Sequence, residues 1–223
     1  DWQFQVAGAS GSQFVMDAAL DSSNYEIAEY NGMKIWAAVR GTKLYVATWG
    51  TGTNGTIRND HFLVLRNDLG DATPSPWAKQ GYVFLGTNYP YLAAEGGNNW
   101  SGWFNATNGT STNSNLGGTY NYLEGELDLA DNFGTVPTAL YMAVGVYGNN
   151  DGDAMVTQVP AMWDDNSNIE VMELLRVPVA SIRDENADGQ FDGGNPEMWT
   201  VVNGNTNDAN YGLRRFFLDE VAG

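Results

Sequence analysis

Apolar and polar residues alternate with a period of two along most of this chain, and this alternation constrains the fold more than any other feature. In residues 33–49, MKIWAAVRGTKLYVATW, two apolar runs flank Arg40-Gly41-Thr42-Lys43, which predicts a hairpin with Ile35, Ala37 and Val39 opposite Leu44, Val46 and Thr48. Turn pairs such as NG, DG and GG separate further short runs. We predict strands over 61–68, 81–87, 102–106, 121–129, 138–148, 153–160 and 214–221.

This spacing of strands and turns predicts an all-β protein, with residues 1–223 forming a single antiparallel β-sandwich of the immunoglobulin-like or jelly-roll kind. Helical periodicity is weak, so we expect long loops and at most one or two short helices, the best candidate being residues 169–175. Residues 105–121 are low in complexity and predict a long surface loop, while 149–155 predict a hairpin turn.

The formal net charge of −17, with only 10 basic residues, argues against a nucleic-acid partner and against an anionic membrane surface. No apolar run reaches the roughly 20 residues that a membrane-spanning helix needs, so we expect no membrane insertion. The absence of Cys excludes disulfides and thiolate zinc sites. The sequence starts at Asp1 rather than Met, as a processed secreted protein would, and we therefore expect an extracellular protein, although a trimmed chain would begin in the same way.

Acidic residues crowd into the string DENADGQFDGG, residues 184–194. The spacing resembles a calcium loop, in which oxygen ligands alternate and a glycine at position 6 allows the sharp turn. The candidate calcium ligands are Asp184, Asn186, Asp188, the backbone carbonyl of Gln190, and Asp192. Asn195 stands where an EF-hand has its bidentate Glu, so the string is closer to the shorter loops of dockerin and thrombospondin-type repeats; a solvated acidic turn is the simpler alternative.

A weaker calcium pattern lies at residues 164–173, where a short capped helix explains the sequence almost as well. Its candidate ligands are Asp164, Asn166, Asn168 and Glu173.

Signals for catalysis are few. His61 is the only His, which leaves a Ser/His/Asp triad without support, and no G-x-S-x-G or phosphate-binding loop occurs. In residues 121–129 the acids Glu124 and Glu126 share one strand face, as the carboxylates of a jelly-roll glycosidase would. Simple alternation, with leucines in the core and acids in solvent, explains the same pattern, so we expect no enzyme and keep a glycosidase as an alternative.

Aromatic residues also stand in loops where a core does not require them, beside amides and carboxylates. A flat ring flanked by such groups suits a sugar, which presents apolar C–H faces edged by hydroxyls, although each ring could equally pack under its own loop. The candidate carbohydrate-binding residues are Trp77, Tyr89, Tyr91, Trp100 and Trp103. Acceptor triplets for N-glycosylation begin at Asn54, Asn99, Asn105 and Asn108.

Several strings together, in their order and spacing, resemble the DOMON-like β-sandwiches related to family 9 carbohydrate-binding modules of secreted bacterial proteins. They include KIWAAVRGTKLYVATWG, NNWSGWFNA, LEGELDLADNFGTVPTALYMAVGVYGNNDGDAMVTQVP and RDENADGQFD, within roughly residues 17–192. The resemblance implies a sandwich that often carries calcium and is usually not catalytic. Some relatives bind sugars and others haem, for which this chain lacks a convincing axial pair.

The function expected from these observations is a secreted, non-catalytic, calcium-stabilised module that binds a polysaccharide or glycan. An alternative is a structural subunit of an extracellular filament or surface layer, which would associate with itself through sheet edges at the termini, residues 2–8 and 214–221.

Overall fold

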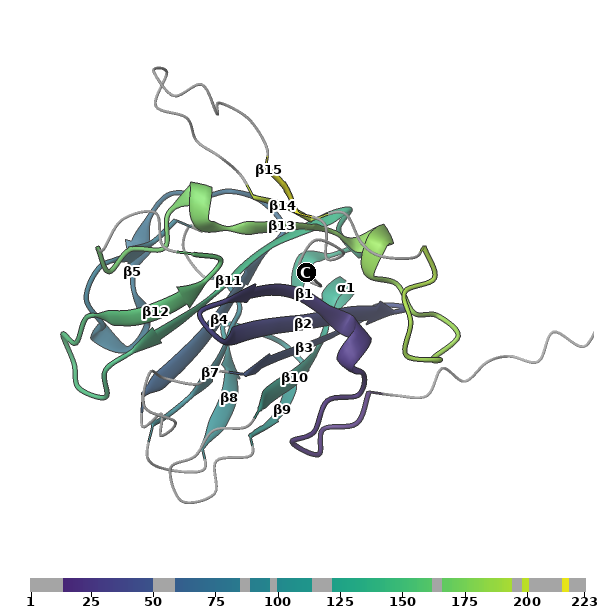
Figure 1. Ribbon diagram of the computed structural model, residues 1–223, viewed down its shortest axis with the longest axis horizontal. Coiled ribbons are helices and arrows are strands. Elements are labelled where there is room, and N and C mark those ends of the chain that lie inside the picture. Colours follow the sequence, from purple (N-terminus) through teal and green to yellow (C-terminus); the bar gives the residue numbers. More distant parts are fainter. Residues whose placement is uncertain are drawn as a thin grey trace, which may run out of the picture.

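The structure is a computed structural model that describes residues 14–49, 59–84, 89–96, 100–113, 122–161 and 166–193, together with the backbone of 198–200 and 214–216. Two antiparallel sheets face each other as a sandwich (Figure 1). The all-β expectation is therefore confirmed. Assignment of all 223 residues to one domain stays a prediction, since both ends of the chain lie outside the described residues.

The smaller sheet has five strands among the described residues. Their order is β1 (Glu26–Tyr30), β2 (Met33–Arg40), β3 (Lys43–Trp49), β10 (Leu123–Asp128) and β9 (Thr110–Asn113). The larger sheet has the order β15 (Arg214–Phe216), β14 (Met198–Thr200), β13 (Leu175–Pro178), β11 (Ala139–Tyr147), β4 (Asp60–Arg66), β7 (Tyr91–Ala94) and β8 (Ser101–Phe104), with β12 (Met155–Val159) also paired to β11. A separate short pair consists of β5 (Thr73–Pro74) and β6 (Tyr82–Val83).

Helices are short. The described chain has one α-helix, α1 (Leu129–Phe133), and four 3₁₀ turns: η1 (Ser23–Tyr25), η2 (Pro76–Ala78), η3 (Val171–Glu173) and η4 (Val179–Ile182). The strand predicted over 121–129 ends at Asp128, whose carboxylate accepts hydrogen bonds from the amides of Ala130 and Asp131 and so caps α1. The helical candidate 169–175 is the single turn η3, followed directly by β13.

The hairpin of β2 and β3 has the predicted register. Ile35 pairs with Thr48, Ala37 with Val46, and Val39 with Leu44, and these residues face the opposite sheet. The turn is tight because Gly41 adopts a left-handed φ of 55°, which is easily tolerated by a residue without Cβ. In contrast, the loop predicted over 105–121 contains a strand, β9, at the edge of the five-stranded sheet.

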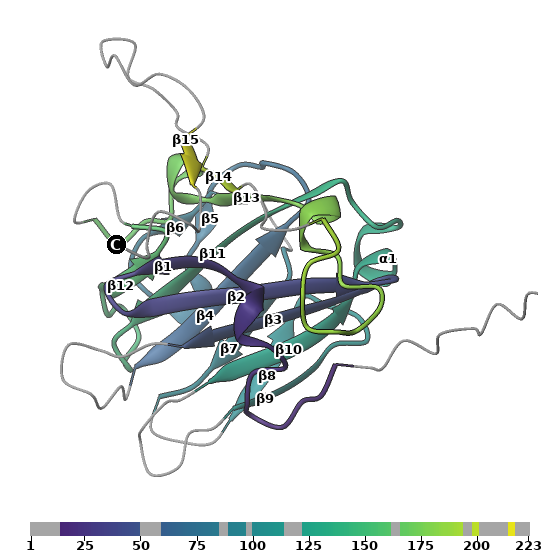
Figure 2. The ribbon, with the colours of Figure 1, turned by 45° about the vertical axis from the view of Figure 1, so that its right-hand side comes forward.

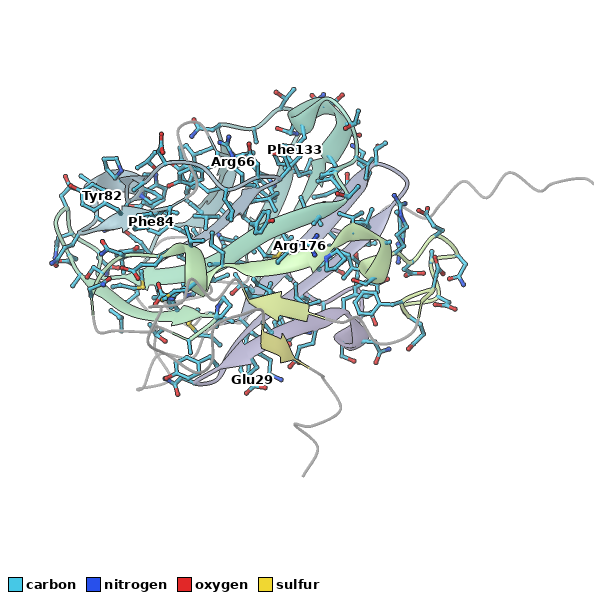
Figure 3. All side chains as sticks on the ribbon, turned by 90° about the horizontal axis from the view of Figure 1, so that it is seen from above. Glu29, Arg66, Tyr82, Phe84, Phe133 and Arg176 are labelled. Atoms are coloured by element: carbon cyan, nitrogen blue, oxygen red, sulfur yellow. The ribbon has the colours of Figure 1, made fainter. Side chains whose placement is uncertain are left out.

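Additional segments cover the outer face of each sheet. Residues 14–25 and the loop 184–191 cover the five-stranded sheet, where Phe14 stacks on Tyr45 with ring centroids 5.1 Å apart. In Figures 1 and 2 the yellow-green loop lies beside the purple turn η1. Residues 73–84 and 166–174 cover the larger sheet over a second apolar cluster that includes Phe62, Val83 and Ile169. Figure 3 shows Tyr82 and Phe84 of this cover on one side of the sandwich and Glu29 on the other.

Self-association through the termini stays a prediction. The backbone of 214–216 forms β15, which pairs with β14 at the edge of the larger sheet, and residues 2–8 lie outside the described residues. No helix within the described part of the chain is long and apolar enough to cross a membrane.

Candidate functional site

Trp77 has an unusual backbone. Its φ and ψ are 50° and 42°, and the next residue, Ala78, also has a positive φ of 53°. A bulky residue in the left-handed region is uncommon, and such backbone strain is concentrated at functional sites. The preceding Pro76 restricts the entry to this turn, and the amide of Lys79 closes it with a hydrogen bond to the Pro76 carbonyl.

The Trp77 turn is attached to the loop that joins β11 to β12. The amide of Gly152 donates to the Ala78 carbonyl over 2.9 Å, and the amide of Gln80 donates to the Asp153 carbonyl over 3.1 Å. The β11–β12 connection, residues 148–154, is the hairpin turn that the sequence predicted. Two segments about 70 residues apart in the chain thus form one rim at the end of the larger sheet.

Three aromatic rings meet at this rim. Trp77 lies 5.6 Å from Trp100 and 5.7 Å from Phe104 between ring centroids, and Trp100 lies 5.5 Å from Phe104. Phe62 and Tyr91 support them from the sheet, since Phe62 contacts Trp77 edge-on at 4.9 Å and Tyr91 stacks on Phe104 at 4.8 Å. Trp100 is 41% exposed, so a large flat ring that is fixed from behind remains open to solvent.

A cavity of about 420 Å³ opens beside these rings, within the range of small-molecule sites. Its lining combines three aromatic side chains with charged and amide groups. The lining residues are Asp60, Trp77, Lys79, Glu95, Trp100, Phe104, Asn149 and Asp151.

Lys79 and Asp60 form an almost fully buried ion pair at 2.8 Å in the cavity wall. The ammonium also donates to the carbonyls of Gly148 and Asn150, at 2.7 and 2.9 Å, so its three donors are all used within the protein. Asp60 in turn accepts a hydrogen bond from the amide of Gly96. These bonds hold the β11–β12 loop and the end of β7 around the cavity.

Of the five predicted sugar-binding residues, the structure brings Trp77 and Trp100 together at the cavity. Tyr89 and Tyr91 are only 5% and 9% exposed and belong to the apolar cluster beneath it. Burial raises the pKa of both phenols, as expected for groups that do not meet solvent. Because side chains alternate along β8, Trp103 points between the two sheets, and its indole N–H donates a hydrogen bond to the Thr110 carbonyl. Tyr89 and Tyr91 are thus buried beneath the surface that Trp77 and Trp100 present, and sugar binding by the five predicted residues stays a prediction.

The predicted calcium loop is closed by contacts within the protein. Asp184 is fully buried, accepts hydrogen bonds from Tyr25 and from the amides of Asp188 and Gly189, and forms an ion pair with Arg40 at 2.8 Å. Although burial alone would raise the pKa of Asp184, the hydrogen bonds from Tyr25 and Arg40 lower it below its ordinary value. The guanidinium thus supplies the positive charge that these acidic residues require.

The remaining predicted ligands of this loop mostly hold its backbone. Asn186 and Asp188 each accept from the amide two residues further on, and Asp192 accepts from the amide of Glu185. No group of three acidic or histidine side chains within the described chain is placed to hold a metal ion. Asp184 would have to give up its ion pair with Arg40 before it could bind calcium, so the side chains as arranged do not form a calcium site around it. Calcium binding by this loop stays a prediction.

The side chains of the second acidic string, residues 164–173, hydrogen-bond to nearby backbone amides. Asn168 accepts from the amide of Tyr82, Asn166 accepts from the amide of Asn168, and buried Glu173 forms a capping box with Glu170. Asp164 lies outside the described residues. These bonds fasten the cover over the larger sheet.

Glu124 differs from the expectation that the acids of β10 face solvent. Its side chain is fully buried under residues 14–25, accepting from the amide of Ala18 over 2.6 Å and from the hydroxyl of Tyr45 over 3.1 Å. Burial raises the pKa of Glu124 to about 7. Because the covering segment shields this carboxyl, it cannot reach a substrate together with Glu126, and the geometry does not support the glycosidase alternative.

His61 is buried in β4, and burial lowers the pKa of its imidazole to about 4. Of the acceptor triplets, Asn105 donates to the Tyr89 carbonyl and Asn108 to the Asp131 carboxylate. Asn54 and Asn99 lie outside the described residues.

Comparison of structures finds a carbohydrate-binding module of family 9 from Caldicellulosiruptor kristjanssonii, solved in complex with cellotriose. The match has a TM-score of 0.39 and 12% sequence identity, and covers 64% of this chain and 77% of that chain. No family model and no curated protein matches the sequence.

Sequence reasoning missed the polar half of the cavity: Asp60, Lys79, Glu95, Asn149 and Asp151. Nothing local distinguishes these residues from solvated side chains. Only Asn149 and Asp151 carried a signal, as parts of a predicted turn, and that signal did not indicate what the turn would face.

Proposed function

We propose that this chain is a non-catalytic carbohydrate-binding β-sandwich of an extracellular protein, and that the sugar binds in the cavity beside Trp77 and Trp100. The observation that carries the proposal is the exposed Trp100 ring, braced by Trp77 and Phe104 at the mouth of a cavity with polar groups on its other wall. Sugar rings stack on aromatic faces while their hydroxyls hydrogen-bond to amides and carboxylates.

The rigidity of the site supports binding. Trp77 is held in a strained backbone conformation, and Lys79 fixes the facing loop through buried contacts. A preformed site avoids the entropic cost of ordering side chains and loops when the ligand arrives.

The proposal is tested by calorimetric titration of the protein with a panel of soluble oligosaccharides. Cello-oligosaccharides are a reasonable first probe, because the family 9 module described above was solved with cellotriose. We expect Trp100→Ala to weaken binding about 10-fold or more, since a central aromatic contact commonly contributes more than 1 kcal/mol.

Tyr82→Ala is the matched control. Tyr82 is also an exposed aromatic residue, at 52%, but it does not line the cavity, so its loss should leave the affinity within about two-fold. Equal losses in the two variants, or no binding to any glycan of the panel, would refute the proposed site. Extracellular placement, which the sequence predicts, is tested separately by locating the protein in culture supernatant or cells.

A further inference from the structure

Arg176 differs from the other Lys and Arg residues whose side chains the structure describes. Each of the others forms an ion pair with an Asp or Glu: Lys34, Arg40, Lys43, Arg66, Lys79 and Arg183. Arg176 is half-buried and has no acidic partner and no side-chain hydrogen bond within the described part of the chain. In a chain with 27 acidic and 10 basic residues, a guanidinium that keeps its donors for a ligand is unexpected.

The arginine lies on the outer face of the larger sheet, beside an aromatic ring. Leu175 and Val177 of β13 pack into the core between the sheets, so the side chain of Arg176 points outward. Tyr141 of β11 lies directly opposite Arg176 in the register, and Arg66 of β4 lies opposite Tyr141 on its other side (Figure 3). The half-buried ring of Tyr141 thus lies between two arginines.

Carboxylates are few around this row. The neighbouring positions on the same face of β4, β11 and β13 are apolar: Val64, Ala139, Ala143 and Pro178. Asp68, two residues beyond the end of β4, is paired with Arg66, which offsets its charge. The face is therefore locally positive, although the chain has a formal charge of −17.

The backbone register continues the same row to the edge of the sheet. Arg176 pairs with Trp199 of β14, and Trp199 pairs with Arg215 of β15. Arg66, Arg176 and Arg215 thus occupy one row of the register and alternate with aromatic residues, in a chain that has only 10 basic residues.

A guanidinium beside an aromatic ring suits a sugar that carries a carboxylate. The planar guanidinium can donate two parallel hydrogen bonds to a carboxylate, and a tyrosine ring can stack on the apolar C–H face of the sugar. A second copy of this chain is a less suitable occupant, because two surfaces of charge −17 repel each other. A short uronic acid oligomer brings few charges, and salt screens its repulsion from distant acids beyond about 8 Å.

We propose that Arg176 and Tyr141 form a second glycan subsite, which binds uronic acid units through their carboxylates. The choice of a sugar rests on the carbohydrate-binding function proposed above, but the location does not. Tyr141 lies near the start of β11, whereas Asn149 of the cavity lies beyond its end, roughly 25 Å further along the strand direction. The two sites can therefore be tested separately.

The test is titration calorimetry at neutral pH with a short oligogalacturonate and with its methyl ester, which keeps the rings and removes the charges. We expect the acid to bind wild type about 3- to 10-fold more tightly than the ester. Arg176→Gln should remove this difference. Arg176→Lys, which keeps the charge but loses the planar fork, should retain part of it.

Two further variants are controls. Arg183→Gln removes an arginine that is already paired with Glu185, and should leave the preference for the acid unchanged. Trp100→Ala alters the cavity and should change binding of the acid less than two-fold. Thermal unfolding of each variant checks that it is folded.

Several outcomes would overturn the second subsite. They are equal binding of acid and ester to wild type, an equal loss in Arg183→Gln and Arg176→Gln, or binding of an oligomer of glutamate as tight as that of the uronide. Loss of a dimer on Arg176→Gln, seen by sedimentation, would instead assign this face to a contact between copies. If Trp100→Ala abolishes uronide binding and Arg176→Gln does not, the acid occupies the cavity, and the proposed function stands while the second subsite falls.

Discussion

Replacement of Glu124 by Gln should change how stability depends on pH. The folded carboxyl has a pKa of about 7 and its ordinary value is 4.5, so between these values the folded protein holds a proton that the unfolded chain releases. Glu124 therefore favours the folded state most below about pH 4.5, and that contribution is lost as the pH rises through about 7. Glutamine keeps an oxygen for the amide of Ala18 and never ionises.

The size of the effect follows from the difference in pKa. The change from 4.5 to about 7 corresponds to at most about 3 kcal/mol at high pH, and solvent screening should reduce this to about 1–2 kcal/mol. His61 acts in the opposite direction, because its buried imidazole has a pKa of about 4 against an ordinary 6.5, and its contribution is lost as the pH falls through this range. The two groups offset each other in the wild type between about pH 4.5 and 6.5.

The assay is urea unfolding of wild type and Glu124→Gln across this range. The stability of the variant relative to wild type should rise from about pH 5 to 8 and then level off. Glu126→Gln, which removes a carboxylate from the same strand face near Lys43, is the matched control and should show no comparable rise. A relative stability of Glu124→Gln that is equal at pH 5 and 8 would refute the reasoning.

Three further changes test other parts of the structure. Gly125→Ala should lower the free energy of unfolding by about 1–3 kcal/mol, because its Cβ would lie within 3 Å of two packed side chains, whereas Gly193→Ala, whose Cβ meets nothing, should change it by less than about 0.5 kcal/mol as measured by urea unfolding. Lys79→Met should lower the free energy of unfolding by about 3–5 kcal/mol, because Asp60 is left buried without its partner. The double variant with Asp60→Leu should recover part of that stability, as measured by thermal unfolding. Asp184→Ala should lower the free energy of unfolding by a similar amount, about 3–5 kcal/mol, with or without a chelator, because the ion pair with Arg40 is buried. A loss of stability that is seen only with calcium present would instead support the predicted calcium site.

Much of the sandwich could be predicted because strand formation depends on a local pattern. The β2–β3 hairpin has the predicted register, and β4, β8, β10, β11 and β12 lie within two or three residues of the predicted strands. The strands that were missed are short: β1 has five residues, β7, β9 and β13 have four each, β14 has three and β5 has two, and β9 also has the composition of a loop. They pair because neighbouring strands present free edges, which no local pattern reports.

The candidate site could be predicted only in part, for a similar reason. Trp77 and Trp100 line the cavity, but the fold buries Tyr89 and Tyr91, and it packs the partly buried Trp103 against the core between the sheets. Whether a loop aromatic is exposed depends on what covers it, and here the cover comes from residues distant in sequence.

Alternation and turn residues in the sequence by themselves determined that this chain forms antiparallel sheets, and its composition determined that the surface is strongly acidic. The tertiary structure alone decided which charges are available. It buries Asp184 against Arg40, Asp60 against Lys79 and Glu124 beneath the segment that begins at Phe14, while Glu95 and Asp151 are exposed to solvent in the lining of the cavity. The physical reason is that the free energy of a charge depends on its solvent exposure and nearest partners, which are set by packing between segments far apart in the chain.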